Sequence, residues 1–148
     1  MVVGGVRPRI RVAPPLPRAY PAGLLRNLAA IRSWVASGAD VDERDATGTT
    51  PLMVASRWHC ADSVVEFLRL GADVRRVNDY GRTAVHLVAE RGKDGGEGAE
   101  VVRLLVRAGC DPAARSTCGV GTVGDLARFL NGPRWAAEVE GWVALATA

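Results

Sequence analysis

The side chains in this sequence that could hold a metal or act as a nucleophile are two histidines and three cysteines: His59, His86, Cys60, Cys110 and Cys118. Zinc sites favour paired ligands such as Cys-x-x-Cys or His-x-x-x-His, and these residues do not have that spacing. A Cys–His nucleophile would need Cys60 or Cys118 to meet a histidine in space. Since His59 and Cys60 are adjacent, they diverge on any helical turn. We therefore predict no catalytic residue, no metal ligand and no cofactor.

Two glycine-rich stretches could be mistaken for phosphate-binding loops. Gly92–Gly98 lacks the Gly-Lys-Ser/Thr signature, and no strand is expected before it. Its four glycines in seven positions favour a flexible loop. Gly119–Thr122 is short and has the pattern of a turn before a capped helix. We interpret both stretches as loops without a binding role.

Length and composition indicate one soluble domain. The chain has 148 residues, of which 48% are hydrophobic and 24% charged, which is ordinary for a globular protein. It contains no run of 18 apolar residues, so we expect no membrane span and no membrane partner. Three cysteines do not form a disulfide framework, which favours an intracellular, cytoplasmic setting.

Charge is distributed unevenly along the chain. Residues 1–39 contain six arginines and no acidic residue, whereas the other 109 residues carry 13 basic and 16 acidic groups. The mildly acidic body argues against a nucleic-acid partner. Residues 1–21 combine four arginines with five prolines, a composition that favours a basic, Pro-rich, partly disordered N-terminal tail. An acidic cluster follows at residues 40–45, and we interpret it as a solvated face.

The segment Gly48–Ala55 has the sequence pattern of a turn followed by a helix. Gly48 can adopt a positive φ in a tight turn. Thr50 can cap a helix by accepting a hydrogen bond from a free backbone amide. Pro51 then falls at the first helical position, where its missing N–H costs nothing. The sequence predicts a helix from about Pro51 to Arg57.

The same pattern recurs 33 residues later. Thr83 follows Thr50 at this distance, and Gly38-Ala39-Asp40-Val41 recurs as Gly71-Ala72-Asp73-Val74 with the same step. A third, imperfect copy is Gly109-Cys110-Asp111-Pro112. This period, together with the Thr-Pro-Leu-His-x-Ala type of motif, resembles the ankyrin repeat.

The resemblance implies an all-α solenoid of stacked helix-turn-helix repeats with protruding β-turn or hairpin loops, and without long-range contacts. It predicts a repeat domain over residues 22–148, with repeats at about 22–44, 45–77, 78–115 and 116–148. The outer two repeats depart most from the motif. In the first, Leu28, Ile31, Trp34 and Val35 share one helical face. In the fourth, an apolar stripe could seal the open end of the stack: Trp135, Val139, Trp142, Val143 and Ala146.

Two further details follow from the resemblance. His86 occupies the histidine position of the motif, where hydrogen bonding within and between repeats is expected. His59 stands where the family has a glycine in the turn between two helices. A non-glycine residue in a left-handed conformation costs about 1 kcal/mol, which we expect the fold to tolerate.

Ankyrin-type proteins typically hold another protein on their concave surface, so the resemblance implies a non-catalytic module for protein–protein interaction. The contact positions of the family lie at the turn tips and just after the small-residue pair of the first helix. In this chain they are Ala46, Thr47, Thr49, Arg57, Trp58, Asp79, Tyr80, Arg82, Glu90 and Arg91.

Two alternatives remain open at this point. The chain could be an enzyme, or a metal- or thiol-dependent protein, built on the same scaffold. It could also be a structural subunit that self-associates through Trp135 and Trp142, if the apolar stripe at the end of the stack is uncovered. We otherwise expect a monomer.

Overall fold

The computed structural model describes residues 26–91, 97–116, 119 and 121–148. The predicted tail at 1–21, most of the predicted loop at 92–98, and Cys118 lie outside these residues. The described residues form α-helices without an extended strand, apart from an isolated bridge between Ser116 and Gly121. The helices are α2 (Leu28–Ala36), α3 (Pro51–Arg57), α4 (Ala61–Arg69), α5 (Ala84–Glu90), α6 (Gly98–Arg107), α7 (Val123–Asn131) and α8 (Pro133–Thr147).

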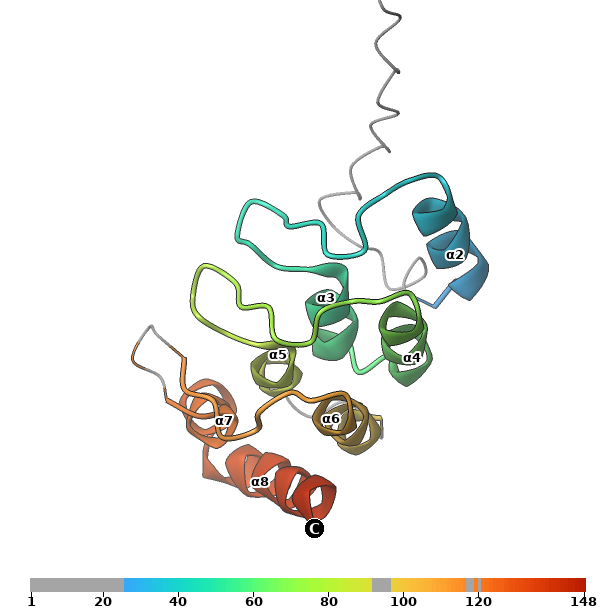
Figure 1. Ribbon diagram of the computed structural model, residues 1–148. Helices are drawn as coiled ribbons and strands as arrows, with labels where there is room; N and C mark the ends of the chain where they lie inside the picture. Colours follow the sequence, from blue (N-terminus) through green and yellow to red (C-terminus); the bar gives the residue numbers. More distant parts are fainter. Residues whose placement is uncertain (1–25, 92–96, 117–118, 120) are drawn as a thin grey trace, which may run out of the picture.

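The helices stack in two columns, as the repeat pattern predicts (Figure 1). The first helices of successive repeats, α3, α5 and α7, pack against one another, and α2, α4 and α6 form the second column beside them. The connections before α3 and α5 protrude together on the side of the first column (Figure 1). Helix α8 packs against both α6 and α7 and covers one end of the stack.

Helix α3 has the bounds that its local sequence predicts. The Thr50 hydroxyl accepts a hydrogen bond from the backbone N–H of Met53 at 3.4 Å, and Pro51 is the first helical residue. Before it, the amide of Gly48 donates to the carbonyl of Asp45 at 3.0 Å, with Gly48 at a φ of +74°. The turn and the cap together fix where this first helix begins.

The core lies between the two columns. The second helices contribute buried apolar residues to it: Val64 and Phe67 of α4, and Val101, Val102 and Leu105 of α6. Each such side chain stabilises the fold by about 1.5–3 kcal/mol relative to exposure. In the first unit, Ile31 of α2 is buried, and Leu28 and Trp34 pack against the same core, as predicted.

Glycine explains how the fourth unit packs. The hydroxyl of Thr122 accepts from the backbone N–H of Asp125 at 3.4 Å and caps α7. Gly124 lies inside this helix, and a Cβ added there would stand 2.7 Å from a carboxylate oxygen of Glu140 in α8. A glycine that weakens α7 as a helix therefore lets α8 approach it closely.

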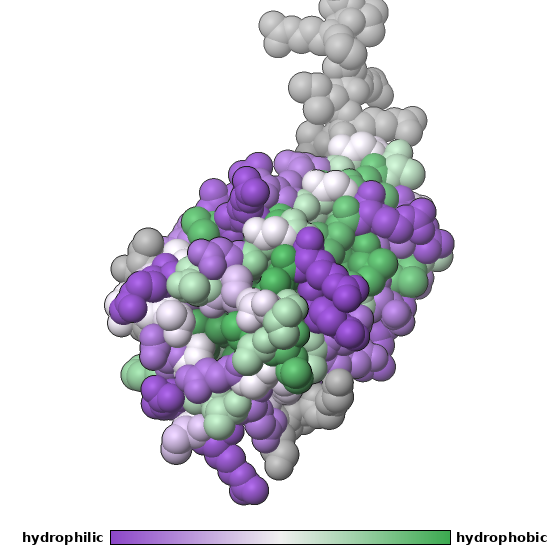
Figure 2. All heavy atoms as spheres, turned by 60° about the horizontal axis from the view of Figure 1, so that its bottom comes forward, coloured by the Kyte–Doolittle hydropathy of each residue, from purple (hydrophilic) through white to green (hydrophobic). Residues whose placement is uncertain are grey.

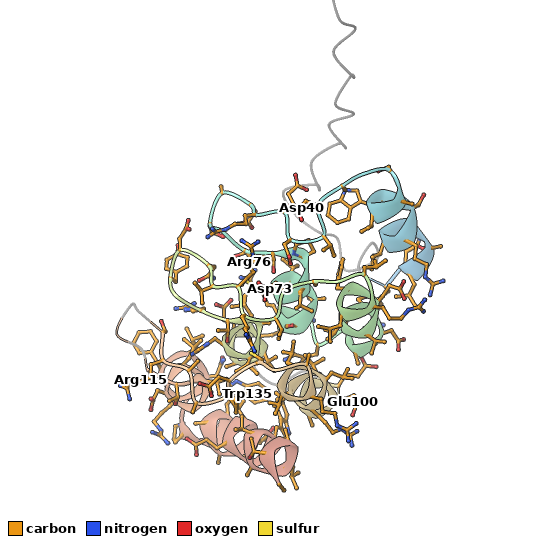
Figure 3. All side chains as sticks on the ribbon, in the orientation of Figure 1. Asp40, Asp73, Arg76, Glu100, Arg115 and Trp135 are labelled. Carbon is orange, nitrogen blue, oxygen red and sulfur yellow. The ribbon has the colours of Figure 1, made fainter. Side chains whose placement is uncertain are left out.

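The apolar stripe of α8 faces the stack and seals its end, as expected. Trp135, Ala136 and Val139 are buried, and Trp142, Val143 and Ala146 pack against the core. Trp135 lies where α8 packs against the helices above it (Figure 3). Its indole N–H donates to the carbonyl of Ala89 at the end of α5, at 2.9 Å. Trp135 is thus an internal residue, which contradicts an interface made by an uncovered Trp135. The helices that the structure describes are all too short or too polar to cross a membrane.

His59 adopts the left-handed conformation expected of this turn, with a φ of +54°. Its ring stacks on Trp135 at 6.4 Å between centroids and meets the edge of Trp142 at 6.2 Å. Its Nε2 lies 2.8 Å from the carbonyl oxygen of Val88. Because His59 belongs to the second repeat and both tryptophans to the fourth unit, the prediction that long-range contacts are absent is wrong.

Candidate functional site

The two described hairpin tips have the same construction. In the second repeat, the Asp45 carboxylate accepts from the backbone amides of Thr47 at 2.8 Å and Thr49 at 3.0 Å. In the third repeat, the side-chain oxygen of Asn78 accepts from the amides of Tyr80 and Arg82, each at 3.0 Å. Burial alone would raise the pKa of Asp45, but the hydrogen bonds from Thr47 and Thr49 lower it overall.

Neighbouring tips are also tied to each other. The amide of Asp79 donates to the carbonyl of Thr47 at 2.9 Å, and Arg44 Nη2 lies 3.4 Å from Asp79 Oδ1. The hydroxyl of Ser116, where the fourth unit begins, donates to the carbonyl of Tyr80 at 2.9 Å. The tips therefore form a continuous edge, along which Tyr80 keeps 47% of its surface exposed.

Three charged residues join the tips to the first helices. Glu90, at the end of α5, accepts from Arg57 Nε at 2.9 Å and from Arg82 Nη1 at 2.6 Å. The guanidinium of Arg82 also lies over the Tyr80 ring, 5.4 Å from its centroid. We call Arg57, Arg82 and Glu90 the charged cluster. With two guanidinium groups and one carboxylate, it keeps one positive charge.

A second contact links the second and third repeats beside this cluster. The guanidinium of Arg91 lies over the Trp58 ring, 4.1 Å from its centroid, which is a cation–π geometry. Both residues follow directly after their helices, Trp58 after α3 and Arg91 after α5. This pair packs half-buried, so Trp58 presents only part of its surface to solvent.

The structure brings the ten predicted contact residues to one side of the molecule but exposes them unequally. Ala46, Thr47, Asp79 and Tyr80 are exposed at the tips, and Arg57, Trp58, Arg82, Glu90 and Arg91 are half-buried. Thr49 is buried, and its hydroxyl lies 2.9 Å from that of Thr47 within the turn. The side chain of Thr49 therefore supports the tip and is not part of its surface.

Two residues of this surface were missed by the sequence reasoning. Phe129 and Leu130 of α7 stand seven and eight positions after the capping Thr122, as Arg57 and Trp58 stand after Thr50. They are 75% and 42% exposed. The spacing from the capping threonine is the signal that could have identified them.

His86 has the structural role that the motif implies. Its Nδ1 accepts from the backbone N–H of Thr83 at 3.2 Å, within the repeat. Its Nε2 lies 3.3 Å from the carbonyl oxygen of Gly121, in the next unit. Burial lowers the pKa of His86, which favours the neutral ring.

The described histidines and cysteines show no arrangement suited to metal or thiol chemistry. Within the described ranges, no group of three or more His, Cys, Asp or Glu side chains is arranged to hold a metal ion. Cys60 and Cys110 are buried free thiols, and burial raises the pKa of both. A raised pKa reduces the fraction of thiolate, which is the reactive form.

Comparisons with known proteins agree with this architecture. A family model described as "Ankyrin repeats (3 copies)" matches residues 22–116. The chain is also similar to Protein fem-1 homolog A of Danio rerio, at 36% identity over 69 residues, and to Inversin of Homo sapiens, at 43% over 64 residues. Neurogenic locus notch homolog protein 2 of Homo sapiens is 42% identical over 50 residues.

These matches cover part of each protein. They span 47%, 41% and 34% of this chain, and 11%, 6% and 2% of the respective relatives. The chain thus corresponds to a small fraction of the length of the relatives it matches. These relatives share the repeat with this chain.

Proposed function

Because this chain belongs to the ankyrin repeat family, we propose that it is a non-catalytic module that binds a partner protein on its concave face. We define this face as the hairpin tips together with the exposed ends of α3, α5 and α7. We further propose that residues 22–148 form one repeat domain whose fourth unit, 116–148, closes one end of the stack. The free thiols Cys60 and Cys110 support an intracellular location.

The observation that carries this proposal is the composition of the concave face. Interface anchors are enriched in Trp, Tyr and Arg, and Trp58, Tyr80 and Arg57 lie together on this side. The tips are held by hydrogen bonds from backbone amides to the side chains of Asp45 and Asn78, and by a bond between neighbouring tips. Such a preorganised surface loses little entropy when it binds.

A quantitative pull-down from the protein's own cell extract tests the proposal. The bait variant Arg57→Ala/Tyr80→Ala alters the concave face, and Glu90 keeps its contact with Arg82. The matched control Val65→Ala/Arg103→Ala makes the same kinds of change on the outer helices α4 and α6, since Val65 and Arg103 are exposed there. Circular dichroism first verifies that both variants are folded.

We expect a protein that the wild type and the control capture and that the concave-face variant loses. A partner that the concave-face variant retains and the control loses would contradict the proposal, because it would place binding on the outer helices. A partner captured equally by all three baits would also contradict it.

A further inference from the structure

The concave face changes its chemistry from one repeat to the next. Each first helix presents a pair of residues at seven and eight positions after its capping threonine. Helices α3 and α5 pack together, as do α5 and α7, so these pairs follow one another along the face. The pairs, which we call the inner-helix row, are Arg57 and Trp58, Glu90 and Arg91, and Phe129 and Leu130.

The α7 end of the inner-helix row is apolar. Phe129 and Leu130 are adjacent in sequence and both exposed, whereas Arg57 and Glu90 at the first of these positions form an ion pair. An aromatic ring offers a large contact area with little rotamer entropy to lose. This end suits an aromatic or aliphatic side chain of a partner.

The middle of the row is positively charged. In the charged cluster, one carboxylate is shared by two guanidinium groups, and Arg57 keeps 37% of its side chain exposed. Arg91, next in sequence to Glu90, carries a third guanidinium group, and the Asp45 carboxylate, which interacts with Arg57, offsets one of these charges. A guanidinium group binds a carboxylate through charge-assisted hydrogen bonds. The charge of this region therefore complements an acidic partner.

The same charge disfavours one occupant that is close at hand. The N-terminal residues 1–25 of this chain carry four arginines and no acidic residue. Placing such a segment on the charged cluster would bring like charges together. These residues therefore do not complement the charged cluster.

We infer that the concave face takes an acidic peptide segment of a partner protein, whose carboxylates pair with the charged cluster and whose aromatic or aliphatic anchor packs on Phe129 and Leu130. The inference rests on the proposed function, because it assigns the chemistry of the partner to the same face. It predicts both a preferred composition of the bound segment and the residues that read it.

Selection from a displayed library of random 16-residue peptides, with the folded chain as target, gives the first measurement. We expect the selected peptides to be enriched in Asp and Glu, with at least one Phe, Trp, Leu or Ile, relative to the unselected library. The strongest peptides are then synthesised with a fluorescent label and titrated by anisotropy at low and high salt. Raising the salt should weaken binding, because exposed charge pairs are screened.

Matched variants then locate the binding. Phe129→Ser should weaken binding of these peptides about tenfold or more, as loss of an interface anchor does. Arg57→Gln leaves the Arg82–Glu90 pair in place. This variant should weaken peptide binding about threefold to fivefold, as loss of a partly exposed ion pair does. Leu145→Ser and Arg103→Gln change residues on α8 and α6 and should leave affinity unchanged.

The outcomes separate this inference from the proposed function. Peptides that are basic or neutral but lose affinity in Phe129→Ser would overturn the inference and leave the concave face as the binding site. Peptides indifferent to both concave variants would overturn the proposed function as well. A library that yields no enriched peptide would overturn the inference. So would a dimer on sizing that Phe129→Ser abolishes, because a second copy would then occupy the face.

Discussion

Helices α5 and α7 have the same type of N-terminal cap, but the capping residues make different further contacts. In each, the residue three positions after the threonine accepts a hydrogen bond from the threonine amide, through His86 Nδ1 at 3.2 Å and Asp125 Oδ2 at 2.9 Å. The Nε2 of His86 also lies 3.3 Å from the carbonyl oxygen of Gly121 in the next unit, whereas Asp125 accepts from the amide and hydroxyl of Thr122 within its own turn. An acceptor is enough to cap the helix. The second ring nitrogen of His86 adds a contact with the next repeat.

The C-terminal ends of α5 and α7 differ as well. Glu90 and Arg91 of α5 are engaged by Arg57 and Trp58 of the preceding repeat. Phe129 and Leu130 of α7 are exposed. Equivalent positions thus tie repeats together in the middle of the molecule and form open apolar surface in the fourth unit. The repeat motif determines where the helix begins, and the position of the repeat in the stack determines what the residues of the helix contact.

The largest loss of stability is expected on removing Trp135, the residue that connects the fourth unit to α5. Trp135→Ala deletes a buried ring and its hydrogen bond to Ala89, and we expect a loss of about 3–5 kcal/mol in the free energy of unfolding. Urea denaturation followed by circular dichroism measures it. Trp135→Phe keeps most of the ring and should lose less. A cost below about 1 kcal/mol for Trp135→Ala would mean that α8 is held elsewhere.

A substitution at Gly98 tests the close packing of α8 against α6. An alanine Cβ at Gly98 would stand 2.6 Å from the Trp142 ring, so Gly98→Ala should cost about 1–3 kcal/mol through overpacking. The control is Gly141→Ala, inside α8, where a Cβ meets no atom within 4 Å. This control should stabilise the protein by up to about 1 kcal/mol. Equal effects of the two changes on the urea midpoint would refute the packing argument.

The pH dependence of stability separates the two caps. The pKa of His86 is lowered by burial, so the unfolded chain takes up a proton more readily than the folded one. Its contribution is present above about pH 6.5 and is lost as the pH falls below that value toward the folded pKa. The pKa of Asp125 is lowered by hydrogen bonds from Thr122, so its contribution is lost only below about pH 4.

Urea midpoints between pH 7.5 and 3 measure both contributions. His86→Gln should flatten the decline between about pH 6.5 and 5, and Asp125→Asn should flatten it below about pH 4. If His86→Gln leaves the decline near pH 6 unchanged, the joint between the third and fourth units does not depend on a neutral His86.

The smallest effect is expected at the open end of the inner-helix row. Phe129→Ser and Leu145→Ser replace side chains that are 75% and 77% exposed, so each should change the free energy of unfolding by no more than about 0.5 kcal/mol. Thermal and urea unfolding check this. A larger loss in Phe129→Ser would assign the ring a role in packing. Figure 2 shows the end of the stack that α8 covers, where hydrophobic residues lie among hydrophilic ones.

How far the sequence predicts this structure depends on how local each feature is. The bounds of α3 follow from Thr50 and Pro51, which act on neighbouring backbone groups. The role of His86 follows from its position in the repeat motif, three residues after the capping threonine. Phe129 and Leu130 obey the same spacing, but Gly124 and an extra residue before Thr122 obscure it. The burial of Thr49 depends on the hydrogen bonds of the folded turn, so the sequence pattern does not predict it.

The contact of His59 with Trp135 and Trp142 has a consequence for how the chain unfolds. In a linear array, stability is a sum of single-repeat terms and nearest-neighbour terms, so that terminal repeats can melt separately. Here the turn of the second repeat loses its aromatic neighbours when the fourth unit melts. The left-handed backbone of His59 would then lack the packing that offsets it. We therefore expect melting of the fourth unit to destabilise the second repeat directly, so that the second, third and fourth units unfold as one cooperative block.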